Sequence, residues 1–544
     1  MPTVSETATR AARLREFLAR REAELAPLQR DLNEETWLAN VTGDPGHERK
    51  AAELEARVRL RFAEREPYQF LVDLRGAGGT ADPLLERQLD VLMRTYRAHQ
   101  VAPAAIQRMV GLEKSLESRF NNFRADLNGR RVGDNQIRDV LQKSLDSRER
   151  RAAWEAAKQI GAEVAGDLLA LVRERNDAAR SLGYPHYYNM MLELDELEEG
   201  ELFALLEELE RGTRPLFETY RRDLDGRLAR QFGIAAADVR PWHMRDPFFQ
   251  EAPPADVDLD PYFAGRSLEQ LTADFFSAIG LDIRDLMARS DLYEKPGKCQ
   301  HAFCMHVDRG QDIRVLCNIR ADEQWMGTML HEFGHAAYDK HLDPGLPYFL
   351  RAPAHTLTTE ASAMLFGRLS KNAAWLTRWA RVPEAEARAA AASCARATRE
   401  QLLVQTRWCL VMCHMERALY RDPAQDLNTL WWDLVERYQM LRRPEGRHGP
   451  DWASKIHFCV APVYYHNYML GEMMASQLQR HILERVLGDG RAWDRYVASP
   501  AVGEFLVSEL YAQGKSADWR GAVRRATGRS LEAAPFVVEL AGTG

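Results

Sequence analysis

The chain has 544 residues, of which 45% are hydrophobic and 28% are charged, as in an ordinary soluble globular protein. Its formal net charge of −7 gives no electrostatic reason to expect binding to nucleic acid or to an anionic membrane. The first residues lack the apolar core of a secretory signal, and no stretch approaches the roughly 18 apolar residues that span a bilayer, so we expect a cytoplasmic protein.

No Ser/Gly linker or low-complexity run divides the chain, so we expect residues 1–544 to form one domain with sub-lobes. Residues 1–100 show partial apolar stripes typical of amphipathic helices, which we interpret as a helical lid region. Asp146 or Ser147 can cap a longer helix that ends near Gly183. The next helix has an apolar residue every fourth position, at Leu216, Tyr220, Leu224, Leu228 and Phe232.

Residues 299–319 are the one credible strand region. Two apolar runs flank a turn at Asp308-Arg309-Gly310, which predicts a β-hairpin. Such a hairpin could be purely structural, or its exposed edge could pair with an extended peptide, and periodicity alone does not decide between the two. The pattern as a whole predicts a mostly α protein with a small β element, in which residues 299–360 form the hairpin and a zinc-binding core.

The segment His331-Glu332-Phe-Gly-His335 carries the clearest chemical signal. Two histidines four residues apart fall on one face of a helix and can reach the same tetrahedral zinc ion. Glu332 lies beside that metal, where a carboxylate can take a proton from a zinc-bound water. The flanking residues are almost wholly apolar, and three polar groups would be costly to bury there without a metal. This H-E-x-x-H pattern is typical of zinc peptidases.

A catalytic zinc needs a third protein ligand, and the sequence offers two candidates. His341 sits where a longer form of the motif places a third histidine, but that form needs a glycine where this chain has Tyr338. Glu360, at the start of a second predicted helix, is the other candidate. We favour Glu360, because His341 on a continuing helix points to a different face from the first two ligands.

These residues resemble the angiotensin-converting enzyme type of zinc dipeptidyl carboxypeptidase. More distantly, they resemble thimet oligopeptidase and the bacterial oligoendopeptidases. The resemblance covers nearly the whole chain, through the segments 33–42, 154–184, 299–317, the zinc helix with Glu360, and 455–468. It implies a mostly α, two-lobed helical metallopeptidase with a deep central channel and a small β element beside the zinc helix.

The resemblance also implies roles for residues outside the zinc helix. Glu360 matches the third zinc ligand. His457 matches a residue that hydrogen-bonds the substrate or its tetrahedral intermediate, and Tyr468 matches the donor of a phenol to the developing oxyanion. Lys455 and Tyr465 match residues that hold the terminal carboxylate of the peptide, and His301 and Ala302 match groups that hold its backbone.

The chain departs from the family pattern at several of these positions. Met364 replaces an acid that orients a zinc histidine, and Asp339 is a possible substitute. Met244 stands where a glutamine that helps to bind the substrate is expected. The segment 457–468 has one extra residue relative to the converting enzymes, so either Tyr464 or Tyr465 could face the site. Asn467 replaces an arginine that binds chloride.

Seven cysteines without a Cys-x-x-Cys pair are expected to be reduced thiols. The spacing of Cys299 and Cys317 matches a disulfide of the secreted converting enzymes, but we expect both to be free here.

From these observations we expect a zinc metallopeptidase that hydrolyses short peptides, as a dipeptidyl carboxypeptidase or an oligopeptidase. A dedicated peptide-maturation enzyme of a biosynthetic pathway and an inactive peptide-binding homologue are the alternatives.

Overall fold

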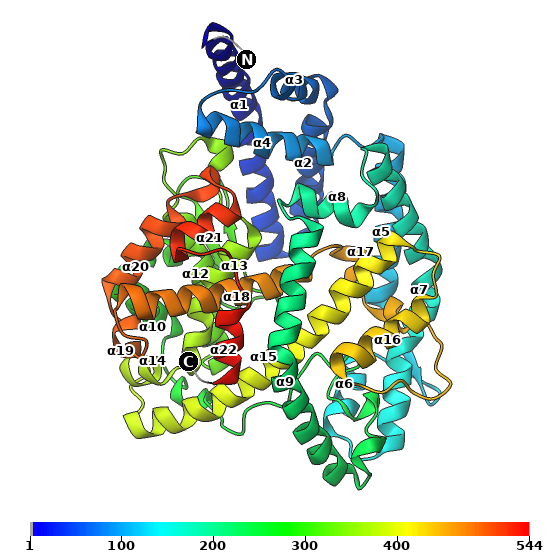
Figure 1. Cartoon of the computed structure of the whole chain (residues 1–544). Helices are drawn as coiled ribbons and strands as arrows, with labels where there is room; N and C mark the ends of the chain where they lie inside the picture. The colour runs from blue at the N-terminus through cyan, green and yellow to red at the C-terminus, as the bar shows by residue number, and fades with distance from the viewer. Residues whose placement is uncertain (1–3, 543–544) are drawn as a thin grey trace. The chain divides into compact units, whose positions relative to one another are not determined.

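The computed structural model describes residues 4–542, and these residues form helices and two small two-stranded sheets (Figure 1). The predicted mostly α fold is therefore confirmed. The chain divides into two compact units, of which the first comprises Met1–Gln100, Val257–Cys394 and Leu470–Pro535, and the second Val101–Asp256, Ala395–Met469 and Phe536–Gly544. The division falls inside α15 (Glu384–Arg421), α18 (His466–His481) and α22 (Ala534–Ala541).

The first unit contains the predicted metal-binding helix and the predicted hairpin. Its first segment is four helices, α1 (Val4–Thr42), α2 (Pro45–Ala63), α3 (Arg65–Gly76) and α4 (Pro83–Ala98). Its middle segment contains α10 (Leu268–Ala278), α11 (Arg284–Arg289), β3 (Phe303–His306), β4 (Ile313–Leu316), α12 (Glu323–Lys340), α13 (Thr356–Gly367) and α14 (Ala373–Arg378). After α18 come α19 (Trp493–Tyr496), α20 (Pro500–Leu506) and α21 (Trp519–Thr527).

The predicted hairpin is the antiparallel pair β3–β4, in which Phe303 lies opposite Leu316 and His306 opposite Ile313. Helix α1 packs against it. Trp37 forms a small apolar cluster with Leu316 and Phe303, and the side-chain amide of Asn33 donates to the backbone oxygens of His306 and Val307 at 3.2 and 2.9 Å. The hairpin is thus fixed on one side by the first helix of the chain.

The helices that carry the candidate ligands begin at well-defined caps. The Asp322 carboxylate accepts the N–H of Trp325 at 2.8 Å and starts α12. His355 starts α13, because its Nδ1 accepts the N–H of Leu357 at 3.0 Å. A short 3₁₀ turn, η4 (Tyr348–Leu350), lies between the two helices. Local capping therefore fixes where each ligand-bearing helix begins.

The second unit is built on long helices. Its elements are α5 (Pro103–Asn122), β1 (Ala125–Leu127), β2 (Arg130–Val132), α6 (Asp134–Lys143), α7 (Ser147–Ser181), α8 (Tyr187–Leu194), α9 (Glu199–Phe232), α16 (Leu427–Gln439) and α17 (His457–Val460). The Asp146 carboxylate caps α7 as expected. The β1–β2 hairpin was not predicted, although its Asn128-Gly129 turn, with φ of 55° and 80°, is a known hairpin signal.

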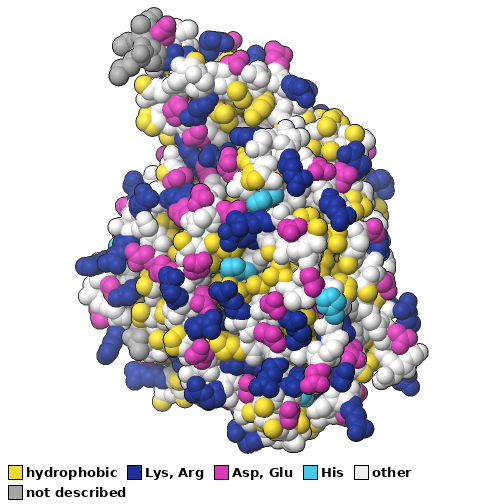
Figure 2. All heavy atoms as spheres, turned by 45° about the vertical axis from the view of Figure 1, so that its right-hand side comes forward, with side chains coloured by type: hydrophobic (Ala, Val, Ile, Leu, Met, Phe, Trp, Pro, Cys, Tyr) yellow, Lys and Arg dark blue, Asp and Glu magenta, His cyan; other side chains and the backbone are white. Residues whose placement is uncertain are grey.

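Basic and acidic side chains are interspersed over the face drawn in Figure 2, in keeping with the small net charge. Within residues 4–542, no helix is both long enough and apolar enough to cross a membrane. All seven cysteines are free thiols, Cys299 and Cys317 included.

Candidate active site

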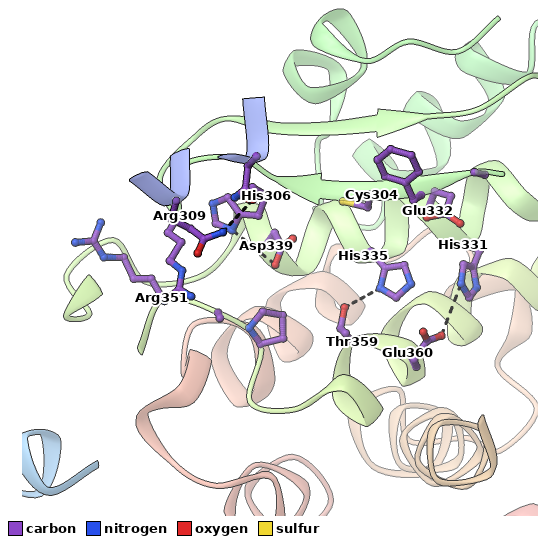
Figure 3. A pocket seen from close by; sticks show the side chains of 16 residues that line it. Cys304, His306, Arg309, His331, Glu332, His335, Asp339, Arg351, Thr359 and Glu360 are labelled. Carbon is purple, nitrogen blue, oxygen red and sulfur yellow. Dashed lines mark hydrogen bonds and ion pairs between the residues drawn. The ribbon is translucent and has the colours of Figure 1, made fainter. Parts of the chain in front are cut away.

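Three side chains that can bind a metal ion converge where α12 meets α13 (Figure 3). His331 and His335 project from α12 and Glu360 from α13, with one ligand atom of each within 4.8 Å of the others. The imidazole centroids are 4.9 Å apart, and His331 Nε2 lies 3.9 Å from Glu360 Oε2. Two imidazole nitrogens and one carboxylate oxygen form the kind of ligand set that holds a catalytic zinc and leaves a fourth position open.

The protonation states of these side chains favour the binding of a cation. Burial lowers the pKa of His331 to about 4 and that of His335 to about 3, so both imidazoles are neutral at neutral pH. Burial also raises the pKa of Glu360. Burial of Glu332 and electrostatic repulsion by Glu360 together raise the pKa of Glu332 to about 8. A bound divalent cation would favour the charged form of both carboxylates. The residues present therefore fit a zinc ion.

The rival ligand His341 stands apart from this cluster. It is the C-cap residue that follows Lys340, the last residue of α12, and its Nδ1 lies 2.8 Å from the backbone oxygen of Ala337, one turn earlier. The helix continues through Tyr338, where the longer motif would need a glycine to turn the chain. The geometry therefore favours Glu360 over His341 as a partner of the two histidines.

Gly334, between the two histidines, lets α13 approach α12 closely. A Cβ atom at this position would lie 2.9 Å from Ala363 Cα and 3.0 Å from Phe366 Cδ2. Both neighbours belong to α13, the helix that carries Glu360. The absence of a side chain at Gly334 therefore sets the spacing between the helices that bring the three ligands together.

Substituting Gly334 should consequently disturb both the fold and the metal site. We expect Gly334→Ala to lower the free energy of unfolding by about 1–3 kcal/mol, because the core there has no room for a methyl group, and to weaken zinc binding. Denaturant unfolding and a zinc titration provide the measurements. The matched control is Gly166→Ala in α7, where nothing lies within 4 Å of the new Cβ and a helix gains about 0.5–1 kcal/mol. Equal effects at the two sites would contradict this account.

Thr359 orients the second histidine. Its Oγ1 lies 2.7 Å from His335 Nδ1, so Nε2 is left to bind a metal. Asp339, the possible substitute named above, has its Oδ1 3.9 Å from His306 Nδ1 instead. Thr359 was not predicted from the sequence, although it is the residue immediately before Glu360.

Removing this hydroxyl should loosen the metal without unfolding the protein. We expect Thr359→Ala to weaken zinc affinity by roughly 10- to 100-fold, the usual effect of losing a partner of a ligating histidine. Thr359→Ser keeps the hydroxyl and should retain most of the affinity. Competition with a chromophoric chelator measures both values. If the alanine and serine variants bind zinc equally well, the hydrogen bond does not orient His335.

Glu332 lies on α12 close to β3, and only 8% of its surface is exposed. The backbone N–H of Cys304 in β3 lowers the pKa of this carboxylate slightly, against the larger effect of burial. Cys304 and Glu332 line the same cavity, so the hairpin forms the wall beside the carboxylate.

A cavity of about 550 Å³ opens onto these groups. Its walls come from α1, the β3–β4 hairpin, α12 and residues 351–360. Of the two residues expected to hold a peptide backbone, Ala302 lines the cavity, whereas His301 is exposed just before it in the chain. In the described part of the chain β3 pairs with β4, and whether its other edge binds an extended peptide stays a prediction.

The predicted carboxylate-binding residues belong to the second unit, where they form a cluster of their own. Lys455 Nζ lies 5.0 Å from the ring centroid of Phe248 and 5.2 Å from that of Trp408. Burial lowers the pKa of Lys455 to about 8. The indole N–H of Trp408 donates to the Tyr465 hydroxyl at 3.3 Å. Trp408 thus contacts both Lys455 and Tyr465.

The glutamine expected at position 244 has a counterpart elsewhere. Met244 is buried, with its sulfur 3.8 Å from an Arg221 nitrogen. Gln250, six residues later, accepts a hydrogen bond from Lys455 Nζ at 3.0 Å. A side-chain amide therefore does contact Lys455, and it belongs to Gln250, which was not predicted from the sequence.

The structure distinguishes Tyr465 from Tyr464. The Tyr465 ring is buried 4.9 Å from the His457 ring and 5.6 Å from the Tyr468 ring, measured between centroids. Tyr464 is half-buried and packs 5.3 Å from Tyr468. Tyr465 is therefore the tyrosine that belongs with Lys455 and His457.

The segment that carries His457 is anchored by one buried arginine. Arg175 of α7 donates to the backbone oxygens of Phe458 and Cys459 at 2.9 and 2.6 Å. Burial, with a smaller effect from Lys455, lowers the pKa of His457 to about 4. His457 is thus a neutral imidazole at neutral pH, and Arg175 anchors the backbone of the two residues that follow it.

Comparison with known protein families supports a peptidase from a separate part of the chain. Residues 8–240 match the family model of angiotensin-converting enzyme, which confirms the resemblance over this segment and supports a peptidase. No curated protein matches the chain. The matched segment ends before the H-E-x-x-H helix, so the match and the cluster of His331, His335 and Glu360 are separate observations.

Proposed function

We propose that this chain is a zinc-dependent peptidase that hydrolyses short peptides. The observation that carries the proposal is the convergence of His331, His335 and Glu360, with Glu332 directly beside them in the same cavity. The match of residues 8–240 to a peptidase family supports it from a different part of the chain.

In this proposal His331, His335 and Glu360 would hold a zinc ion, which when bound would lower the pKa of a water molecule. Glu332 would accept a proton from water on its carboxylate oxygen and would return a proton to the nitrogen of the leaving amine. Thr359 keeps His335 in the tautomer that binds the metal through Nε2.

The proposal assigns stabilisation of the oxyanion to His457 and Tyr468, as the resemblance implies. Both can donate a hydrogen bond at neutral pH, because His457 is a neutral imidazole with one N–H and Tyr468 carries a phenol. Donors that are fixed in advance stabilise a developing negative charge most effectively.

Lys455, Tyr465 and Gln250 are proposed to bind the terminal carboxylate of the peptide, and His301 and Ala302 to bind its backbone. The contact between Lys455 and Gln250 supports this assignment, because it restores the amide that Met244 lacks. Anchoring by the terminal carboxylate favours release of dipeptides from the carboxyl end. Without such anchoring, the enzyme would be an oligopeptidase that cuts internally.

The oxyanion donors and the carboxylate-binding residues should have different effects on the kinetics. We expect Tyr468→Phe to lower kcat by roughly two to three powers of ten, the usual effect of losing one oxyanion donor. Lys455→Ala should mainly raise KM, and only for peptides with a free carboxyl end. Each peptide is compared with its C-terminal amide. Equal cleavage of both forms by the wild type, unchanged in Lys455→Ala, would rule out carboxylate anchoring.

The proposed function is tested with a mixture of random short peptides. The zinc-loaded protein is incubated with the mixture, and mass spectrometry reports the bonds that are cut. We expect cleavage that a chelator abolishes and added zinc restores. Cleavage that survives complete removal of the metal would overturn the proposal, and so would a zinc-loaded protein that cleaves nothing.

A further inference from the structure

The cavity beside the metal-binding residues has a second, basic end. Figure 3 shows Arg309 and Arg351 on the side of the view opposite to His331 and Glu360, and all four residues line the same cavity. Arg309 lies in the turn between β3 and β4, and Arg351 follows η4. Two arginines from separate segments thus meet in one cavity.

Arg309 has no acidic partner in the described part of the chain. Its Nη1 donates to the backbone oxygen of Tyr348 at 3.3 Å, and its guanidinium lies 4.9 Å from the centre of the Tyr348 ring. The neighbouring Asp308 carboxylate is occupied by the N–H groups of Gly310 and Asp312. The guanidinium is therefore held in position on an aromatic ring, with its charge uncompensated.

Arg351 is similarly available. Its Nε donates to the backbone oxygen of Leu346 at 2.8 Å, which fixes the side chain and leaves the two terminal nitrogens. The carboxylate of Glu22 is 3.9 Å from Nη2, too far for a hydrogen bond, and is itself 43% exposed. A weak, solvated ion pair of this kind contributes little to stability, so another anion can easily replace Glu22.

The two charges also affect each other. Burial lowers the pKa of Arg309, and the positive charge of Arg351 lowers it further. Like charges close together in a partly buried cavity are unfavourable until an anion joins them. A guanidinium matches a carboxylate in shape and can bind it through two parallel hydrogen bonds.

We propose that Arg309 and Arg351 form an anion subsite that binds a carboxylate of the peptide substrate, so that the cavity selects acidic peptides. The inference rests on the proposed peptidase function and adds the chemical class of the preferred substrate. The carboxylate belongs either to an Asp or Glu side chain or to the free end of the peptide, and the two sources are separated by experiment.

The test uses binding, so that it does not depend on catalysis. Zinc-loaded Glu332→Gln protein is titrated calorimetrically with alanine hexapeptides that are acetylated and amidated and carry one Glu at each position in turn. Each peptide is paired with its Gln analogue. A further peptide without Glu, but with a free carboxyl end, tests the second source. We expect the preferred acidic peptide to bind about 10- to 100-fold more tightly than its neutral analogue, the usual effect of a charge-assisted contact.

The same titrations are repeated after adding Arg309→Asn or Arg351→Gln. Arg309 has φ of 55°, a conformation that asparagine tolerates well, so Arg309→Asn removes the charge without straining the turn. We expect the acidic preference to fall to near onefold, while the neutral peptide binds as before. Arg320→Gln, which removes an exposed arginine paired with Glu294, is the matched control and should keep the preference.

Two outcomes would overturn the subsite: a preference below about twofold for both the Glu peptides and the peptide with a free carboxyl end, or a preference that persists in both arginine variants. A preference confined to the peptide with a free carboxyl end would assign the subsite to the terminal carboxylate. Failure of the wild type to cleave any peptide would count against the proposed function alone, because these affinities are measured on protein that cannot hydrolyse.

Discussion

Glu332→Gln should lower kcat by about two to four powers of ten, the usual contribution of a positioned general base. The amide keeps the size of the side chain, but it cannot take up a proton at neutral pH. Peptide cleavage followed by chromatography gives kcat, and atomic absorption of the same sample gives bound zinc.

The metal content is the control in this experiment. Glu332 is not one of the three clustered ligands, so the variant should hold as much zinc as the wild type. Turnover close to that of the wild type would remove Glu332 from the mechanism. A variant that has lost its zinc would instead show that Glu332 holds the metal.

The second large effect is expected at the third ligand. Glu360→Gln should strongly weaken zinc retention and therefore hydrolysis, because a neutral amide is a poor replacement for a carboxylate on zinc. His341→Ala should leave both nearly unchanged, since that imidazole lies against the backbone oxygen of Ala337 at the end of α12. Dialysis against a weak chelator, followed by metal analysis, compares the two variants.

The reverse result would identify His341 as a ligand. It would also mean that α12 unwinds before Tyr338 in the metal-bound protein. A circular dichroism spectrum of each variant shows whether a loss of zinc comes from the ligand or from the fold.

The parts of the site that could be predicted depend on spacing within single elements. His331, Glu332 and His335 share one helix, whose period fixes their relative directions. Glu360 follows from the same argument, because His341 at the end of that helix faces elsewhere. The hairpin at 299–319 was predicted from two apolar runs around one turn, and the strands Phe303–His306 and Ile313–Leu316 confirm it.

The parts that were missed depend on contacts between distant segments. Thr359 meets His335 across 24 residues, and Gln250 meets Lys455 across 205. Nothing in the local pattern marks either residue, because each acquires its role only when two helices or loops pack. Arg309 and Arg351 also come together only in the folded protein, because Arg309 belongs to a turn and Arg351 to a connection between two helices. The three-residue strands around Asn128 were too short to give a period.

The close contact of α13 with Gly334 has a consequence for the life of the protein in a cell. In the unfolded chain nothing holds Glu360 near His335, so the proposed zinc ion would bind the folded unit in preference, and each bound ion would shift the folding equilibrium toward it. Free zinc at 1,000 times the dissociation constant would add about 4 kcal/mol. A chain whose helices fit less closely needs more free zinc for the same stability. The supply of metal, rather than the sequence alone, would then decide how long each copy escapes proteolysis.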